Sequence, residues 1–132
     1  MKTITSILVL LLSAIQLFAQ PAIEWQKTYG GNSFDECKSI HQTIDGGYIA
    51  TGSSASNNGD VMDHFGGNDF WILKLNISGS IQWNKVLGGS GNDVPYYIQQ
   101  TSDGGYFVAG YTESDDHDVS GNHGGFYDGW VV

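Results

Sequence analysis

One stretch of this sequence occurs twice: Ile23-Glu24-Trp25-Gln26-Lys27, followed by Gly30-Gly31, returns as Ile81-Gln82-Trp83-Asn84-Lys85, followed by Gly88-Gly89. Aligning residues 23–67 with residues 81–125 without a gap gives 19 identities in 45 positions. Unrelated sequences of ordinary composition would agree at roughly one position in fifteen. The chain therefore carries two copies of one supersecondary unit, and such repetition is typical of repeat architectures.

The composition indicates strands joined by tight turns. The chain has 19 glycines, seven tyrosines, six phenylalanines and four tryptophans among 132 residues. Segments rich in aromatic and β-branched residues recur at short intervals, and each is bounded by Gly, Asp, Asn or Ser. The turn Thr-x-Asp-Gly-Gly-Tyr occurs at residues 43–48 and again at residues 101–106. Glycine is needed there because tight hairpin turns place residues at positive φ, so two copies of this turn predict two copies of one hairpin.

Each unit is predicted to hold four antiparallel strands and one long acidic, glycine-rich loop. In the first copy the strands begin near Asp35, Gly47, Asp69 and Ile81. The repeat is about 58 residues long, the offset from Ile23 to Ile81. Four antiparallel strands in each repeat favour an all-β fold of β-propeller blades. A β-solenoid is the main alternative, and a two-repeat sandwich is a weaker one.

This register divides the chain into parts. Residues 23–31 are expected to form a lone outer strand, residues 35–89 a complete blade, and residues 93–132 a truncated blade of an incomplete ring. A ring of six to eight such blades would need roughly 350–460 residues. We therefore expect an N-terminal fragment of a longer protein, in which residues 24–29 complete the final blade and close the ring.

The first residues resemble a secretory signal peptide. Met1-Lys2 precedes an apolar run from Ile4 to Phe18, and Ala19 supplies a small residue at its end. We expect residues 1–19 to be removed, which leaves residues 20–132 as the repeat region. An uncleaved anchor is the alternative, but the run is shorter than the ~20 apolar residues of a spanning helix. The sequence thus predicts a secreted protein without stable membrane insertion after cleavage.

The charge balance excludes one class of partner. Without residues 1–19 the chain has four lysines, no arginine and 14 carboxylates, a formal net charge of −10. Binding to nucleic acid depends on Lys and Arg that neutralise phosphates, so nucleic-acid binding is excluded. Attraction to an anionic membrane surface is disfavoured for the same reason. Cys37 is the only cysteine, so no disulfide can form within the chain.

Three motifs in fixed order resemble a known family of repeats. They are Asp-Val-x-Gly-Asn-His-Gly-Gly at residues 118–125, the Thr-x-Asp-Gly-Gly-Tyr turn, and Trp-x-Lys-x-x-Gly-Gly. Together they resemble the tandem β-propeller repeats of proteins secreted by Bacteroidetes-type bacteria, which are often cargo of type IX secretion. The resemblance spans residues 23–132 and implies a large modular protein outside the cell or on its surface.

Four aspartates beside the glycine-rich loops are candidate metal ligands: Asp60, Asp69, Asp118 and Asp128. Carboxylates held by a tight loop are ligands that Ca²⁺ prefers. Their spacing does not match a twelve-residue EF-hand loop. Hydrogen bonding of these side chains to the backbone of their turns is the interpretation that the residues favour over calcium.

Other acidic and histidine side chains give no catalytic site. The pairs Asp35 with Asp93 and Asp45 with Asp103 are candidates for acid–base hydrolysis, but each recurs with its own turn, which favours a structural role. Imidazole with carboxylate suits transition metals, and loop residues of this kind are His64, His117, His123, Asp115 and Asp116. No pair of them has metal-ligand spacing, so solvated loop residues are favoured. Neither a nucleophile elbow nor a phosphate-binding loop occurs, and we predict no catalytic or cofactor-binding residue.

The sequence therefore predicts a non-enzymatic, secreted β-propeller segment. Its expected role is a scaffold or an interaction platform for a protein or a glycan, at the bacterial surface or outside the cell. The alternative is a non-catalytic fragment of a larger secreted hydrolase or lyase.

Overall fold

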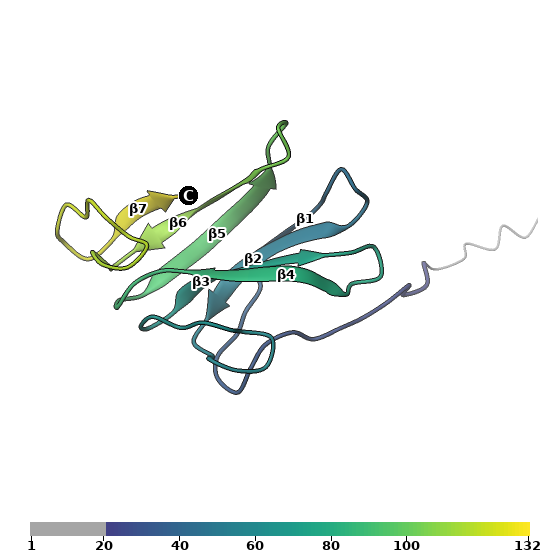
Figure 1. The fold of residues 1–132 in the computed structure, drawn as a ribbon, viewed down its shortest axis with the longest axis horizontal. Helices are drawn as coiled ribbons and strands as arrows, with labels where there is room; N and C mark the ends of the chain where they lie inside the picture. Colours follow the sequence, from purple (N-terminus) through teal and green to yellow (C-terminus); the bar gives the residue numbers. More distant parts are fainter. Residues whose placement is uncertain (1–20) are drawn as a thin grey trace, which may run out of the picture.

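The computed structural model describes residues 21–132, which form two antiparallel sheets (Figure 1). Seven strands and no helix occur in this part of the chain, so the predicted all-β class is confirmed. The two sheets do not close into a ring. The expected signal peptide, residues 1–19, lies outside the described residues. Within residues 21–132 there is no helix of the length and apolarity needed to cross a membrane.

The first sheet has four strands in chain order: β1 (Ser39–Gln42), β2 (Tyr48–Ser54), β3 (Asp69–Leu75) and β4 (Ile81–Leu87). Neighbouring strands are joined by hairpin turns or by the glycine-rich loop, so every pair is antiparallel. All seven residues of β3 are buried, which agrees with its continuous apolar sequence. In contrast, β4 is largely exposed or half-buried along its length.

The second sheet has three strands: β5 (Asp93–Gln100), β6 (Tyr106–Thr112) and β7 (Asp128–Val131). The ladder between β5 and β6 is interrupted between Pro95 and Tyr97. Proline has no N–H to donate, so a bulge at this position leaves no ladder hydrogen bond missing. Within the described residues β7 pairs only with β6, and its other edge has no strand beside it.

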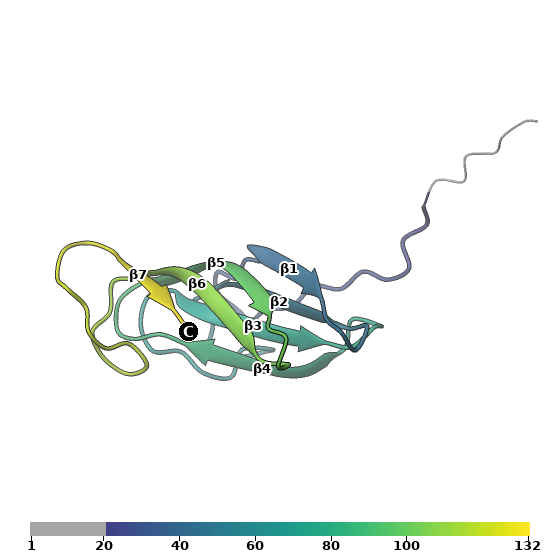
Figure 2. The same cartoon turned by 90° about the horizontal axis from the view of Figure 1, so that it is seen from above.

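The two sheets stack face to face around an apolar core, with β5 lying against β2 (Figure 2). This inter-sheet core joins five buried residues: Ile49, Phe70 and Ile72 of the first sheet with Ile98 and Val108 of the second. The ring of Trp130 packs on Phe70, with ring centroids 4.7 Å apart. Burying side chains of this size stabilises the stack by about 1.5–3 kcal/mol each.

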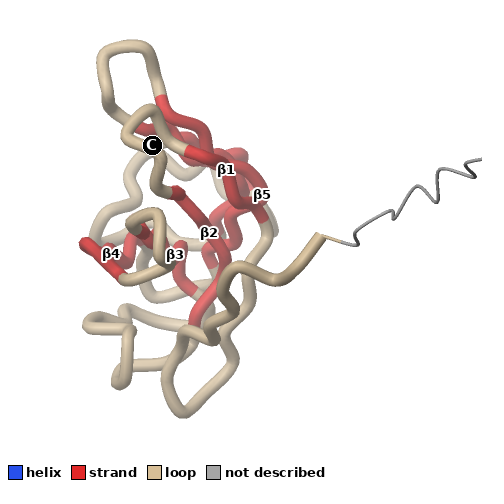
Figure 3. The backbone as a smooth tube through the Cα atoms, turned by 90° about the vertical axis from the view of Figure 1, so that its right-hand side faces the viewer, coloured by secondary structure: helices blue, strands red, loops and turns tan. Residues whose placement is uncertain are grey.

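The other face of the first sheet carries a second apolar cluster, formed by Ala50, Val61, Trp71, Leu73, Leu75 and Val86. It is covered in part by residues 23–31, here called the N-terminal segment, which crosses the sheet before the chain reaches β1 (Figure 3). Trp25 and Tyr29 of this segment pack against the cluster. The stack therefore runs from the N-terminal segment through the first sheet to the second.

The N-terminal segment is not a β-strand, in contrast to the expected lone outer strand. Side chains hold it instead: Lys27 Nζ donates to Ser80 Oγ at 3.0 Å, and the Tyr29 hydroxyl donates to the carbonyl of Gly79. A strand is defined by backbone hydrogen bonds to a neighbour. No described strand lies beside this segment to supply them.

Candidate functional site

Each long loop is held by an aspartate near the start of its sheet: Asp35 lies just before β1, and Asp93 is the first residue of β5. Asp93 is fully buried, and its Oδ2 accepts hydrogen bonds from Gly89 N at 2.7 Å and Ser114 Oγ at 2.9 Å. Its Oδ1 accepts from the Thr112 hydroxyl. One carboxylate thus ties together the end of the first sheet, the start of β5 and the loop after β6.

The same contacts occur one repeat earlier, at Asp35. Its Oδ2 accepts from Gly31 N at 2.8 Å and from Ser56 Oγ at 2.9 Å, and its Oδ1 accepts from Ser54 Oγ at 2.5 Å. Asp35 and Asp93 therefore act separately, each within its own loop, rather than as a pair of acid–base groups. Their repetition follows from a loop structure that needs a carboxylate at this point.

The two hairpin turns use a second aspartate in the same way. The backbone N–H of Gly47 donates to Asp45 at 3.1 Å, and that of Gly105 donates to Asp103 at 3.1 Å. A threonine hydroxyl two residues before each aspartate also donates to it. The hydroxyl and the N–H lower the pKa of Asp103, because both stabilise the carboxylate.

Asp45 has an additional partner, Lys74 of β3. The buried Lys74 Nζ lies 2.8 Å from Asp45 Oδ2 and donates to Gln82 Oε1 at 3.0 Å. The ammonium group, with the Thr43 hydroxyl and the turn N–H, holds the pKa of Asp45 far below its ordinary value. Lys74 therefore links the β1–β2 turn to β3 and β4, and a structural role accounts for both members of this ion pair.

Two of the predicted calcium ligands, Asp60 and Asp118, lie in equivalent positions of the two long loops. Asp60 Oδ2 accepts from Gly30 N at 3.1 Å, and Asp60 N donates back to Gly30 O at 3.0 Å. Asp118 makes the same two contacts with Gly88, at 3.4 and 3.1 Å. Each aspartate thus fixes its loop to a glycine at the start of the preceding turn.

The other two, Asp69 and Asp128, begin β3 and β7. Asp69 is fully buried, and its Oδ2 accepts from Phe65 N at 2.9 Å and lies 3.2 Å from His64 Nδ1. Burial raises the pKa of Asp69, and the charge of Asp93 acts in the same direction. Asp128 Oδ2 accepts from the backbone N–H of His123 at 2.7 Å. His64 and His123 thus contact aspartates of their own loops, whereas the ring of His117 packs against Phe65 of the other long loop.

The buried carboxylates of Asp69 and Asp93 both lie close to Gly88, where a larger residue would not fit. A Cβ on Gly88 would lie 2.2 Å from Asp69 Oδ1 and 2.8 Å from Asp93 Oδ2. Asp69 Oδ1 has no hydrogen-bond partner among the described residues. Even so, residues 21–132 contain no group of three or more His, Cys, Asp or Glu side chains that could hold a metal ion. Calcium binding by the four aspartates stays an untested prediction.

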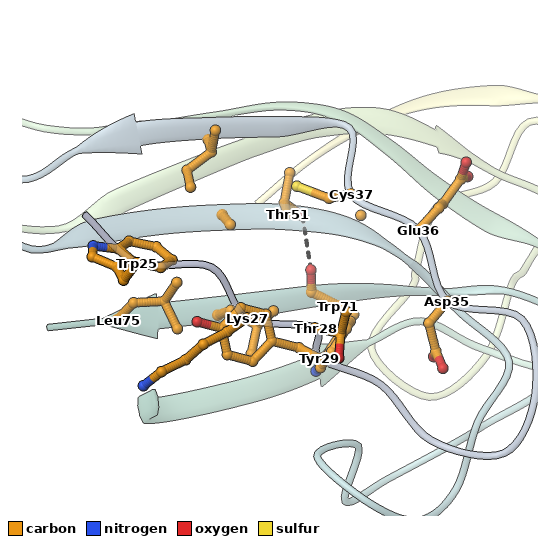
Figure 4. A pocket seen from close by; sticks show the side chains of 14 residues that line it. Trp25, Lys27, Thr28, Tyr29, Asp35, Glu36, Cys37, Thr51, Trp71 and Leu75 are labelled. Carbon is orange, nitrogen blue, oxygen red and sulfur yellow. Dashed lines mark hydrogen bonds between the residues drawn. The ribbon is translucent and has the colours of Figure 1, made fainter. Parts of the chain in front are cut away.

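A pocket of about 350 Å³ lies between the N-terminal segment and the first sheet (Figure 4). Its walls are mainly apolar, with Trp25 and Tyr29 on one side and Trp71, Leu73 and Leu75 on the other. This pocket was not predicted from the sequence. The sequence feature that could have indicated it is the match of Trp25 with Trp83 in the repeat. By this match, the N-terminal segment should pack on the first sheet in the way that β4 packs on the second.

Cys37 lines the same pocket, yet its thiol is not activated. Cys37 is an exposed residue, but partial desolvation of its thiol raises the pKa of that thiol above its ordinary value. Thr51, another lining residue, donates its hydroxyl to the Trp71 carbonyl at 3.1 Å and is thereby satisfied. The pocket therefore offers apolar surface rather than a nucleophile.

The loop between β6 and β7, residues 113–127, is the most prominent exposed feature and projects beyond both sheets (Figures 1 and 2). Phe126 and Tyr127 on this loop are 86% and 63% exposed. Acidic residues accompany them, and Ser90, by hydrogen bonding, lowers the pKa of Asp116. Aromatic faces beside carboxylates can stack on sugar rings or contact cationic groups of a protein.

Comparison of the chain with protein-family models and with curated protein sequences finds no match. Function is therefore inferred from the chain's own residues: the hydrogen-bonded loop aspartates, the apolar pocket and the exposed aromatic side chains of residues 113–127.

Proposed function

We propose that the two sheets are successive blades of a β-propeller and that the protein is a non-enzymatic platform that binds a protein or a glycan through its loops. Consecutive antiparallel strands in sheets that stack face to face support the propeller arrangement. The constant offset between matching sequence positions, as from Asp35 to Asp93 and from Asp45 to Asp103, supports it further. The bacterial, secreted setting rests on the N-terminal sequence and on the resemblance of the three motifs.

The observation that carries the proposal is a repeated loop framework with dissimilar tips. The framework residues Asp60 and Asp118 hold the same backbone contacts, and the valines after them are both buried. Beyond them, the first loop exposes Met62, which is 74% exposed, whereas the second has Ser120 at the matching position. A constant framework that presents different side chains is suited to recognition, because the tips can vary without loss of the fold.

The recurring carboxylates argue against acid–base catalysis by these residues. Asp45 and Asp103 each accept hydrogen bonds from a hydroxyl and a backbone N–H of their own turn. Asp35 and Asp93 each accept from the N–H of a glycine in the preceding turn and from hydroxyls at the end of β2 or β6 and in the loop that follows it. A pair of glycosidase carboxylates would instead flank one substrate bond, about 5–9.5 Å apart. The alternative, a non-catalytic fragment of a larger secreted hydrolase or lyase, is a second proposal.

Binding to immobilised cellulose, xylan and chitin oligosaccharides, and to a panel of bacterial cell-envelope proteins, tests the platform. We expect the purified protein to bind one of these probes, and Phe126→Ser combined with Tyr127→Ser to abolish that binding. Ile77→Ser is the matched control, since Ile77 is 68% exposed at the β3–β4 turn, at the far end of the strands. Equal loss in both variants would contradict recognition by the loop. Release of reducing ends or of unsaturated products from a saccharide would contradict both the non-enzymatic platform and the non-catalytic fragment.

A further inference from the structure

One residue of the second long loop, residues 113–127, has an unfavourable backbone conformation. In the described part of the chain, His117 is the only residue other than glycine with a positive φ, at 54°. A side chain in this left-handed region crowds its own backbone, and such a conformation persists only where the surrounding structure imposes it. The presence of a histidine here therefore calls for a contact that its side chain makes.

The matching residue of the first long loop, residues 55–68, is a glycine. Gly59 has a φ of 67°, and a Cβ added to it would lie 2.4 Å from the carbonyl oxygen of Gly30. Both copies of the loop thus have the left-handed conformation at this position, and glycine adopts it without a steric cost. The second loop has His117 where the first has the residue best suited to the backbone.

Hydrogen bonds on both sides of His117 hold it in this conformation. Asp116 Oδ1 accepts from Ser90 N at 2.7 Å, and Asp118 N donates to Gly88 O at 3.1 Å. The corresponding bonds hold the first loop. The bond from Gly88 N to Asp118 is longer than its counterpart in the first loop, 3.4 Å against 3.1 Å. The histidine therefore does not improve the hydrogen bonds of its own loop.

The contact that His117 adds is with the first long loop. Its ring lies on that of Phe65, with the ring centroids 5.1 Å apart and the ring planes inclined by 38°. Aromatic pairs at this separation attract each other beyond the area that they bury. Phe65 in turn packs against the apolar cluster of the first sheet, and its N–H donates to Asp69 Oδ2 at 2.9 Å. A glycine in place of His117 would leave this anchored ring without its contact from the second loop.

We infer that His117 is a positioning residue that joins the two long loops into one rigid surface. Its ring holds the second loop on Phe65 of the first loop, and this contact offsets the cost of the left-handed backbone. The inference rests on the proposed platform, because it states how loops with dissimilar tips keep a fixed relation to each other. Loops that are fixed in advance lose less conformational entropy on binding a partner than loops that move independently.

Hydrogen exchange of single backbone amides, measured by NMR on the purified protein without any ligand, tests this contact. The Phe65 N–H reports on the first loop through its bond to Asp69, and the Asp118 N–H reports on the second through its bond to Gly88. In His117→Gly we expect the Phe65 amide to exchange about two- to tenfold faster, because the aromatic pair is lost. The Asp118 amide should exchange at an equal or lower rate, because glycine relieves the strained backbone.

Three further variants separate the ring of His117 from its backbone. His117→Phe keeps a ring against Phe65, so the Phe65 amide should stay as protected as in the unmodified protein. His117→Ala keeps the strained backbone and removes the ring, so it should accelerate exchange at Phe65 as much as His117→Gly does. Met62→Ser is the control in the first loop, since Met62 is 74% exposed, and it should change neither amide.

The coupling between the loops must also act in the reverse direction. Phe65→Leu should accelerate exchange of the Asp118 amide, and by a smaller factor when His117 is already glycine. An unchanged Phe65 amide in both His117→Gly and His117→Ala overturns the inference, as does an equal acceleration in Met62→Ser or in His117→Phe. Since no ligand is used, the loops can prove coupled in a protein that binds none of the platform probes, and the two failures are distinguishable.

Discussion

Replacing Gly110 by alanine tests the close approach of β5 to β6. A Cβ at this position would lie 2.1 Å from the carbonyl oxygen of Val94 and 2.6 Å from Pro95 Cα. Ordinary van der Waals contact begins near 3.4 Å, so the new methyl group would be more than an ångström too close. In the first sheet, a Cβ added to Gly52 would likewise lie only 1.7 Å from the carbonyl oxygen of Glu36.

The obstructing atoms decide the magnitude. Val94 O and Pro95 Cα belong to the backbone of a strand that is paired with β6, so they cannot turn aside as a flexible side chain would. Overpacking of this kind destabilises proteins by about 1–3 kcal/mol, and the stiff backbone places Gly110→Ala near the upper end. Loss of glycine freedom in the unfolded chain offsets about 0.4–1 kcal/mol of this. We expect a net decrease of about 2 kcal/mol in the free energy of unfolding.

Urea unfolding followed by tryptophan fluorescence measures the change. With a slope of about 1–2 kcal/mol/M for a chain of this size, the midpoint should fall by about 1–2 M. Gly129→Ala on β7 is the matched control, because no atom lies within 4 Å of a Cβ there and its φ is not in the left-handed region. Its midpoint should stay constant or rise slightly. If Gly110→Ala and Gly129→Ala have equal midpoints, the steric argument is refuted.

Three further predictions concern acid stability, the core and calcium. The pKa of Asp45 is lower in the folded protein than its ordinary value of 3.8, so its contribution to folding stability is present above that value and is lost as pH falls below it. In a plot of unfolding midpoint against pH, Asp45→Asn should therefore flatten the decline at acid pH more than Asp103→Asn does, since Asp103 has no lysine partner. Equal slopes for the two variants would contradict the role of Lys74. Phe70→Ala leaves a cavity at a fully buried site and should lower the free energy of unfolding by about 3–5 kcal/mol. The exposed Phe126 is the control, and Phe126→Ala should change that free energy by less than about 0.5 kcal/mol. Thermal melts measure both variants, and equal melting temperatures would contradict the prediction. Adding millimolar Ca²⁺ should leave the melting temperature of the protein unchanged, because the loop aspartates already accept hydrogen bonds from the backbone. A clear rise in the melting temperature would instead support calcium binding by these aspartates.

Much of the secondary structure was predictable because it depends on local chemistry. The predicted starts near Gly47, Asp69 and Ile81 agree with β2, β3 and β4, since turn residues and apolar runs mark them directly in the sequence. The start predicted near Asp35 was wrong, because β1 begins at Ser39 and Asp35 forms only an isolated bridge with Ser54. The close-approach role of glycine in β2 and β6 was also predictable, because small residues within an apolar strand indicate a nearby backbone. Turn roles for the recurring aspartates follow from the same local logic.

Other features depend on residues that are distant in the chain. The buried contact of Lys74 with Asp45 and Gln82 brings together three elements, and no local pattern announces it. The expected outer strand at residues 23–31 lacks a strand partner, because backbone pairing is a property of two segments and not of one.

The twin sequences that begin at Ile23 and Ile81 thus determined the repeat, its turns and its strands, because spacing and side-chain type are local properties. They did not determine which faces and edges are covered. Ile40 and Ile98 are the same residue in the same register, yet one is 50% exposed and the other is 0% exposed. Only the tertiary structure decided this difference, since burial depends on what packs in front of a residue and that partner comes from a different part of the stack.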